Sequence, residues 1–333
     1  MLQAHCLQCL DMRYNEDKLI RGKGVRMASI VESEFIWRNG KQIPWAEATT
    51  HILSHALHYG TAVFEGMRCY KTETGSAVFR LREHMKRLCN SASMIGMDLP
   101  YTADDLTEAA LDLIRVNGLD SCYVRPIAFR GYGAVGVNPR PAIIDVAIAV
   151  WPWGDYLGPE ALEKGITAGI SSWRQRSVNA TPGAVKSSAG YLNSGLAHME
   201  ALDHGYVEAI LLNEAGLVAE GSGENIFIVR DGKLFTPPLS DGILEGLTRN
   251  SVIQIARDLG YEVTERSLVR TDLYSADEVF FTGSAAEVTP IAAIDNRVIG
   301  SGRRGPVTKE LQERFFEIVA GRVPEYKHWL YEV

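Results

Sequence analysis

The chain has 333 residues, 46% of them hydrophobic and 23% charged, which is typical of globular proteins and excludes a disordered or fibrous class. Its formal net charge is −7, with acidic and basic residues interspersed, so it lacks the basic surface that a nucleic-acid partner requires. No apolar stretch approaches the roughly 20 residues of a membrane-spanning helix, and at about 150 residues per domain the length predicts two domains in solution.

The amino-terminal segment shows no targeting signal. Residues 1–26 lack an apolar signal-peptide stretch and contain acidic residues that a transit peptide avoids. We therefore expect residues 1–30 to be a loose extension, with either Met1 or Met27 as the start.

The cysteines are sparse and odd in number, which predicts reduced thiols and a cytoplasmic location rather than a disulfide framework. Two of them form a CxxC beside His5, but no second pair follows, so we expect no zinc site there. The five are Cys6, Cys9, Cys69, Cys89 and Cys122.

Residues 31–150 predict a small α/β domain, because strand-like and helical patterns alternate along them. In chain order we expect a β-hairpin over 35–45 that turns at Asn39-Gly40, a strand over 77–81, helices over 82–94 and 104–118, and β-rich segments over 122–129 and 143–151.

Residues 151–160 concentrate Pro, Gly and aromatic side chains, which predicts an interdomain linker. A larger, mixed α/β domain is expected over 161–333, so the fold class is α+β in two domains. Its expected elements are a strand over 165–173, a helix over 188–205, short strands over 207–237, a helix over 247–260, and strands over 262–268 and 278–284.

Gly131, Gly133 and Gly136 have the GxGxxG spacing of a dinucleotide-binding loop. That motif must open a helix whose N-terminus holds the pyrophosphate. Pro139 and Pro141 prevent such a helix. We interpret the segment as a loop over a pocket and keep a nicotinamide-dependent dehydrogenase only as a rival hypothesis.

His51, His55 and His58 lie at helical spacing and could imitate metal ligands. The apolar residues between them instead predict a segment that packs on a core, so no metal is expected; these residues are Ile52, Leu53, Ala56 and Leu57. The sequence also has no GxSxG motif, which leaves a hydrolase triad without its nucleophile.

Lys186 stands among small residues in 182-PGAVKSSAGYLNSGLA-197, just before a predicted helix. Glu220 lies in a glycine-rich turn, and the backbone amides of Gly246, Leu247 and Thr248 begin a helix that can bind an anion. An amine nucleophile, an acid and an anion site are what an aldehyde cofactor with a phosphate group needs.

Seven motifs, in order, resemble those of the fold-type IV pyridoxal-phosphate enzymes, and within them the branched-chain amino acid aminotransferases. They are SHALHYGTAVFEGMRCY (54–70), YVRP (123–126), GYGAVGVNP (131–139), the lysine segment, EGSGEN (220–225), EGLTR (245–249) and GSAAEVTP (283–290). The resemblance implies transamination of leucine, isoleucine and valine with 2-oxoglutarate, pyridoxal 5′-phosphate as cofactor, and at least a homodimer.

The resemblance also implies the cofactor contacts. Lys186 is similar to the lysine that bonds the cofactor and moves the substrate proton, for which we expect a lowered pKa. Glu220 would contact the ring nitrogen and Tyr191 the ring oxygen. Leu244 would pack on the ring, and the phosphate would be held by Arg87, Gly246, Leu247, Thr248 and Ser284.

On the substrate side, the resemblance implies an apolar cage made by Phe64, Trp153, Tyr156 and Tyr191. The amides of Ser284 and Ala285 would hold the α-carboxylate. Tyr59, Tyr123 and Arg125 would accept a second carboxylate, and Val135 and Val137 would reach the pocket of a neighbouring subunit. The chain departs from the family at Ser284, where threonine is common.

Several alternatives share the fold: a D-amino acid aminotransferase, an (R)-selective amine transaminase and an aminodeoxychorismate lyase. YVRP together with GYGAVGVNP favours the branched-chain L-amino acid type over these. From another class we keep a catalytically silent relative that binds small acids.

Overall fold

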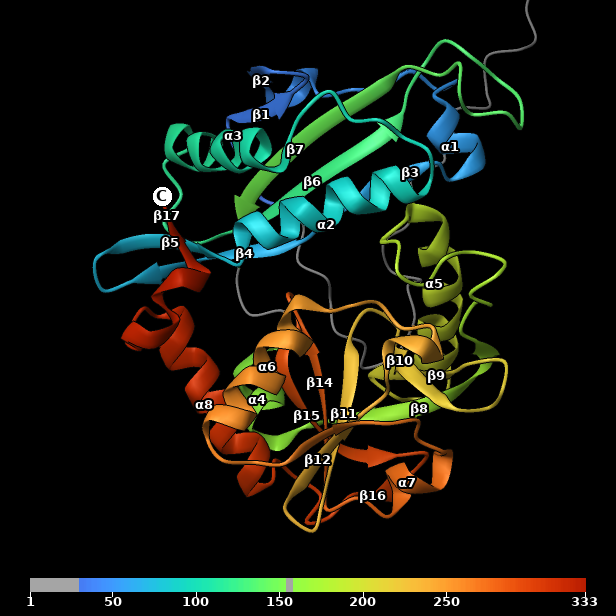
Figure 1. The fold of residues 1–333 in the computed structure, drawn as a ribbon, viewed down its shortest axis with the longest axis vertical. Coiled ribbons are helices and arrows are strands. Elements are labelled where there is room, and N and C mark those ends of the chain that lie inside the picture. Colours follow the sequence, from blue (N-terminus) through green and yellow to red (C-terminus); the bar gives the residue numbers. More distant parts are fainter. Residues whose placement is uncertain (1–29, 154–157) are drawn as a thin grey trace, which may run out of the picture.

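The computed structural model describes residues 30–153 and 158–333. It contains two β-sheets, each with its own helices, which form the upper and lower lobes in Figure 1. The predicted α+β class is confirmed. Tyr156 and nearly all of the predicted extension lie outside the described residues.

The upper lobe is built on an eight-stranded sheet in the order β17-β5-β4-β6-β7-β1-β2, with β3 paired to β6. Its strands are β1 (Phe35–Arg38), β2 (Lys41–Pro44), β3 (Ala62–Phe64), β4 (Met67–Thr72), β5 (Gly75–Phe79), β6 (Cys122–Arg130), β7 (Ile144–Pro152) and β17 (Leu330–Glu332). Its helices are η2 (Trp45–Glu47), α1 (His55–Tyr59), α2 (Leu81–Met94) and α3 (Ala103–Val116).

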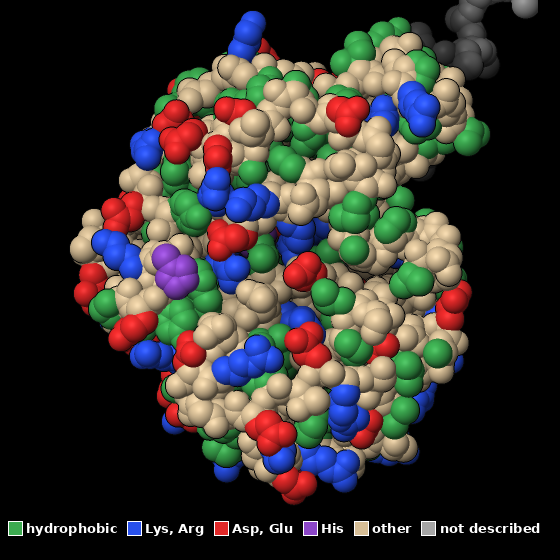
Figure 2. Space-filling view, viewed as in Figure 1, with side chains coloured by type: hydrophobic (Ala, Val, Ile, Leu, Met, Phe, Trp, Pro, Cys, Tyr) green, Lys and Arg blue, Asp and Glu red, His purple; other side chains and the backbone are tan. Residues whose placement is uncertain are grey.

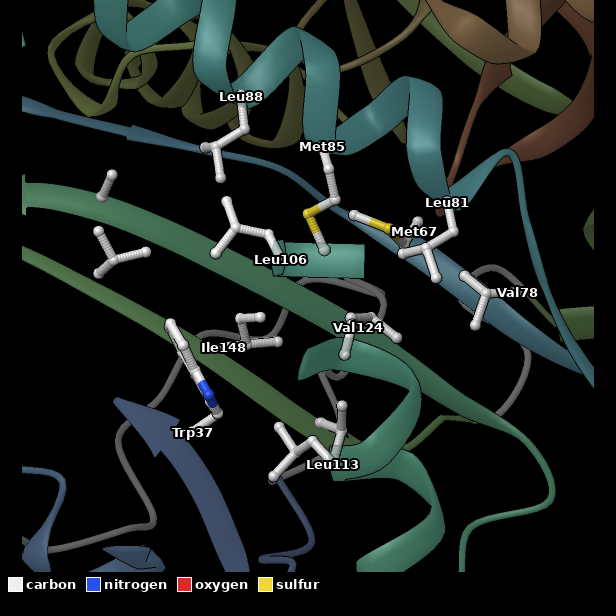
Figure 3. Close-up of a cluster of buried hydrophobic side chains, with 14 of the residues drawn as sticks. Trp37, Met67, Val78, Leu81, Met85, Leu88, Leu106, Leu113, Val124 and Ile148 are labelled. Atoms are coloured by element: carbon white, nitrogen blue, oxygen red, sulfur yellow. The ribbon is translucent and has the colours of Figure 1, made fainter. Parts of the chain in front are cut away.

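Helices α2 and α3 cover one face of this sheet and enclose a hydrophobic core. Leu88 and Met85 from α2 and Leu113 from α3 point at Val124 and Ile148 on the strands (Figure 3). These side chains are fully buried, and burial of large aliphatic groups supplies the main free energy of such a layer. The face that carries the site is therefore backed by a rigid layer.

The lower lobe is a nine-stranded sheet in the order β10-β9-β8-β15-β14-β11-β12-β13, with β16 paired to β15. Its strands are β8 (Ile166–Arg174), β9 (Glu208–Leu212), β10 (Val218–Gly221), β11 (Asn225–Arg230), β12 (Lys233–Thr236), β13 (Val263–Glu265), β14 (Glu278–Gly283), β15 (Glu287–Ile294) and β16 (Arg297–Val298). The helices are α4 (Gly158–Lys164), α5 (Ser188–Asp203), η3 (Leu239–Asp241), α6 (Leu247–Asp258), α7 (Arg270–Tyr274), α8 (Pro306–Val319) and η4 (Pro324–Trp329).

Turn and capping residues account for several of the observed ends of strands and helices. Asn39 and Gly40 both have positive φ, 48° and 84°, as a tight hairpin turn requires. Thr102 caps α3, because its Oγ1 accepts a hydrogen bond from the Asp105 amide at 3.1 Å and the Asp105 carboxylate accepts one from the Thr102 amide at 2.8 Å. The predicted strand over 77–81 ends earlier, at Phe79, since Arg80 turns the chain with φ 56°.

The end of the chain departs from a simple sequential division. β17 pairs with β5 of the upper sheet, and Phe79 packs against Trp329 and Phe315 with ring centroids 5.8 Å and 5.4 Å away. The last residues thus join the upper sheet although they belong to the stretch predicted as the second domain. The predicted boundary between two domains at residues 151–160 stays a prediction; it lies between β7 of the upper sheet and β8 of the lower sheet.

The part of the chain that the structure describes contains no helix long and apolar enough to cross a membrane. On the face shown in Figure 2, Lys and Arg side chains intermingle with Asp and Glu, without an extended patch of either sign. This agrees with the interspersed charges of the sequence.

Candidate active site

A cavity of about 970 Å³ lies between the two lobes and is lined by residues from both. It brings together most of the residues that the sequence singled out: Phe64, Arg87, Tyr123, Arg125, Trp153, Lys186, Tyr191, Leu244, Gly246, Leu247, Thr248, Ser284 and Ala285. These residues span more than two hundred positions of sequence, so the convergence is a property of the fold.

Lys186 lies just before α5, where its backbone carbonyl accepts a hydrogen bond from the Phe64 amide of β3 at 3.1 Å. Its Nζ donates to the Tyr191 Oη at 2.6 Å and lies 5.2 Å from the Phe64 ring centre. The amine is therefore held between an aromatic face and a phenol inside the cavity.

The small neighbours of Lys186 have a further reason besides room for a ring. A Cβ on Gly183 would come within 2.3 Å of the Gly242 carbonyl oxygen, and one on Gly190 within 2.6 Å of the Arg176 guanidinium. Both glycines permit close approach of neighbouring segments, and so position the lysine.

In the cofactor-free protein the pKa of Lys186 is raised rather than lowered; the lowered pKa expected of the amine released from the cofactor stays a prediction. Burial does lower the pKa of Lys186, but the nearby Tyr191 oxygen and the Glu65 carboxylate outweigh that effect, and the pKa is raised. In this arrangement the amine is cationic near neutral pH.

Glu220 projects from β10, and three groups donate hydrogen bonds to its carboxylate. They are Gln175 Nε2 at 2.5 Å, Asn225 Nδ2 at 3.1 Å and the Leu244 amide at 3.1 Å. Burial raises the pKa of Glu220 to about 7, although the Leu244 amide and Lys186 act against it. A cation beside this carboxylate would restore its charge, which suits contact with a protonated ring nitrogen.

A pH dependence follows from this shift. The pKa of Glu220 is about 7 in the folded protein, against an ordinary value of 4.5. Between pH 4.5 and about pH 7 the folded protein therefore binds more protons at this group than the unfolded chain does. In ligand-free protein this group should therefore reduce the free energy of unfolding by about 3 kcal/mol as pH rises from about 5 to 8.

Urea denaturation of wild type and Glu220→Gln at both pH values measures this effect. The difference in stability between the two proteins should change by that amount across the range, because other titrating groups cancel in the comparison. An unchanged difference would exclude a raised pKa at Glu220.

Arg87 is held by a buried acid that the sequence analysis did not single out. Its Nε and Nη2 donate to the two oxygens of Glu65 at 2.6 and 2.9 Å, and His84 Nδ1 lies 2.7 Å from the same carboxylate. Although burial raises it, Arg87 and His84 hold the pKa of Glu65 well below its usual range. The only sequence signal was the place of Glu65 inside the FEGMRC stretch.

The first turn of α6 faces Arg87 across the cavity. Arg87 Nη1 donates to the Glu245 carbonyl at 2.5 Å, and the helix starts at Leu247 with Gly246 as N-cap. A Cβ on Gly246 would lie 1.9 Å from Asn225 Oδ1, so only glycine fits there. A guanidinium and the free amides of a helix N-terminus together make an anion site.

Arg125 forms a second cationic centre with the aromatic residues of the upper sheet. Its guanidinium carbon lies 4.9 Å from the Phe64 ring centre and 5.2 Å from that of Tyr123, and its buried Nε has no hydrogen-bond acceptor among the described residues. Gly66 permits this arrangement, because a Cβ there would lie 2.1 Å from Tyr123 Oη. A buried N–H without a partner is suited to a carboxylate ligand.

Four of the described residues predicted for the site do not line the cavity. Glu220 is joined to it through the amide of Leu244. Tyr59 is 41% exposed, and Val135 and Val137 are 67% and 88% exposed. The exposure of Val135 and Val137 fits their predicted contact with a neighbouring subunit; that contact, and the second-carboxylate role of Tyr59, stay predictions.

The segment around the three histidines differs from its prediction. Ile52, Leu53 and Leu57 are exposed rather than packed on a core, because the helix α1 is a single short turn whose apolar side chains point outward. His55 is buried, with Nδ1 2.8 Å from Thr61 Oγ1 and Nε2 2.8 Å from the Gly136 carbonyl. Residues 137–143, all described, contain no helix after the glycine motif, so the dinucleotide-binding hypothesis loses its support.

The site fits a flat aldehyde cofactor with a phosphate group. The cavity holds the lysine amine and an anion site, and the Glu220 carboxylate accepts a hydrogen bond from the amide of Leu244, which lines the cavity. The buried Thr282 also lines the cavity, and its Oγ1 has no hydrogen-bond partner among the described residues. Such a combination defines an enzyme site for carbonyl–amine chemistry.

Comparison with known proteins agrees with this class. Residues 62–294 match the family model described as Amino-transferase class IV. The branched-chain-amino-acid aminotransferase of Escherichia coli strain K12 is 48% identical over 303 residues, which cover 91% of this chain and 98% of that protein. The chain belongs to the class IV aminotransferase family.

Two solved structures support the fold. A branched-chain amino acid aminotransferase from T.th. with pyridoxamine 5′-phosphate is 51% identical, with a TM-score of 0.88 over 91% of this chain and 99% of that one. The same enzyme complexed with N-(5′-phosphopyridoxyl)-L-glutamate gives 50% identity and a TM-score of 0.87, with the same coverage. The predicted resemblance is confirmed.

Proposed function

We propose that the protein is a branched-chain amino acid aminotransferase that uses pyridoxal 5′-phosphate. It transfers the amino group of leucine, isoleucine or valine to 2-oxoglutarate and gives branched-chain 2-oxo acids and L-glutamate. The observation that carries this proposal is the cavity in which Lys186 Nζ, the Arg87–α6 anion site and the Arg125 cluster converge. The names of relatives at about half identity support it.

When bound, pyridoxal phosphate supplies an aldehyde for the substrate amine and a ring that withdraws electrons from Cα. Arg87 and the amides of Leu247 and Thr248 would hold its phosphate. Tyr191 would hold the ring oxygen, because its Oη lies 2.6 Å from Lys186 Nζ. Glu220 would hold the ring nitrogen, because its carboxylate accepts a hydrogen bond from the amide of Leu244, which lines the cavity.

Lys186 moves the proton in this reaction. Its Nζ would accept the proton from the substrate Cα as general base and donate it to C4′ of the cofactor as general acid, and the same transfer would run backwards with the second substrate. Tyr191, at hydrogen-bond distance, orients the amine. The two substrates react in turn at the same site, as in a ping-pong cycle.

Substrate choice rests on the upper sheet. The aromatic rings of Phe64, Trp153 and Tyr191 offer an apolar wall for a branched side chain, since Phe64 and Tyr191 lie 4.9 Å apart. Arg125, with its partnerless Nε, accepts the second carboxylate of glutamate or 2-oxoglutarate. One pocket can thus serve both kinds of substrate.

We further propose that the enzyme works in the cytoplasm as a homodimer or a higher homo-oligomer. The apolar residues exposed on α1 and on the loop after β6, among them Ile52, Leu57, Val135 and Val137, form a surface that a second copy would cover. In that assembly Val137 would approach the partner's cavity.

A single-turnover test separates this function from its relatives of the same fold. Protein loaded with pyridoxal phosphate should lose its yellow absorption on mixing with L-leucine and regain it with 2-oxoglutarate, whereas D-alanine should leave it unchanged. Turnover of D-alanine without turnover of L-leucine would overturn the proposal. Protein that binds no pyridoxal phosphate would do so as well.

A further inference from the structure

Glu287 has an unusual backbone for a charged residue. It follows the three-residue turn 284–286 between β14 and β15 and pairs with Gly283 across that turn. Its φ is 54°, in the left-handed region. The residue that closes a three-residue hairpin in this way is commonly glycine, because a Cβ makes the conformation unfavourable.

The carboxylate of Glu287 explains why a glycine is not used. Its Oε1 lies 2.9 Å from Arg68 Nη1 and accepts a hydrogen bond from Tyr70 Oη, also at 2.9 Å. The Arg68 and Glu287 side chains are each only 8% exposed. Arg68 and Tyr70 belong to β4 of the upper sheet, so this buried cluster connects the two sheets.

Arg68 and Glu287 form a buried ion pair. Arg68 Nη1 is within ion-pair distance, but neither it nor Nε has an aligned hydrogen-bond acceptor among the described residues. A buried ion pair strongly disfavours loss of either charge, because the remaining one is left uncompensated. A neutral side chain of the same shape therefore tests the contact directly.

The cluster lies directly beside the residues that line the cavity. The turn residues Ser284 and Ala285 line the cavity on the side of the lower lobe, and Tyr123 lines it on the side of the upper lobe. Tyr123 is paired with Arg68 between β6 and β4. Thr289 Oγ1 also donates to the Ala286 carbonyl at 2.6 Å. The turn and Tyr123 are thus held at a defined separation through Glu287 and Arg68.

We propose that Glu287, paired with Arg68, is a positioning residue that holds the 284–286 turn and Tyr123 at the spacing needed to bind the substrate α-carboxylate. This inference rests on the proposed function and on the expectation, from the family resemblance, that the amides of Ser284 and Ala285 hold that carboxylate. The unfavourable backbone of Glu287 is retained because its side chain couples the turn to the opposite sheet.

The test uses the holoenzyme and 4-methylvalerate, which has the carboxylate and side chain of leucine but no amine. We expect Glu287→Gln and Glu287→Gly each to raise the Kd of this ligand about tenfold or more, since small displacements of binding groups are costly. Bound pyridoxal phosphate, measured by absorbance, should remain at the wild-type level. Glu278→Gln is the matched control, because Glu278 is also buried but caps α8 through the Val307 and Thr308 amides.

Glu287→Gln removes the charge and keeps the shape of the side chain, whereas Glu287→Gly removes the side chain and relieves the unfavourable backbone conformation. If Glu287→Gly binds 4-methylvalerate as tightly as wild type, the turn holds itself and the proposal is wrong. The same conclusion follows if the Kd rises equally in Glu278→Gln, since the effect would then be general destabilisation. Wild-type protein that holds neither pyridoxal phosphate nor 4-methylvalerate would overturn the proposed function and this inference with it.

Discussion

Lys186→Ala is expected to lower kcat/KM for the transamination of L-leucine by at least about 10⁴-fold, because it removes both the nucleophile and the base. Lys186 Nζ is the amine held at 2.6 Å from Tyr191 Oη within the cavity. The measurement is glutamate formation from leucine and 2-oxoglutarate. The absorption spectrum of the variant incubated with pyridoxal phosphate should also lack the band that borohydride removes from wild type.

Lys71→Ala provides the control for loss of a lysine. Lys71 is 72% exposed and pairs with Asp120 at 3.0 Å on the surface, where an ion pair contributes little. Its activity should equal that of wild type. If Lys186→Ala kept a tenth of the wild-type activity, another residue would have to supply the base, and the proposed role of Lys186 would be wrong.

Glu220→Gln is expected to lower kcat/KM by about 10²- to 10³-fold, the usual effect of removing one group that stabilises charge in the transition state. Glutamine preserves the shape and can still contact Gln175 and Asn225, so the pocket should remain folded. What is lost is the negative charge that keeps the ring nitrogen protonated. Steady-state rates and bound cofactor content are measured on the same preparation.

Glu220→Asp distinguishes charge from geometry, since it keeps the carboxylate at a shorter reach. We expect it to retain more activity than Glu220→Gln at the same cofactor content. The opposite order, or full activity in the glutamine variant, would show that the charge is not required and would remove Glu220 from the mechanism.

The fold could be predicted from the sequence where the signals are local. The hairpin at Asn39-Gly40 follows from the turn preferences of its residues. The helix expected from residue 104 begins at Ala103; capping preferences account for its N-cap Thr102, which was not identified beforehand. β15, α8 and β17 were not predicted. β17 pairs with β5, and β15 also pairs with β8, both far away in sequence; single-segment patterns do not reveal such partners. The β14–β15 hairpin and α8 are local in sequence and were missed all the same.

The site shows the same division. Lys186, Glu220 and the α6 N-terminus were identified because they occur together and within an ordered set of motifs, each of which is local in the sequence. Glu65, His84 and the Glu287–Arg68 pair were missed, because an acid becomes a counter-charge only when folding removes it from water beside a cation. The raised pKa of Lys186 in the cofactor-free protein likewise depends on neighbours that folding brings together.

By itself, the sequence determined the chemistry of this protein: an ordered set of motifs, each local, names the amine, the acid and the anion site. Only the tertiary structure decided their electrostatics and spacing. Two sheets meet around one cavity. At their junction Arg87 and His84 hold the pKa of Glu65 well below its usual range, burial raises the pKa of Glu220 to about 7, and Glu287 pairs with Arg68. Those effects depend on distance and on exclusion of water, which are properties of the packed chain.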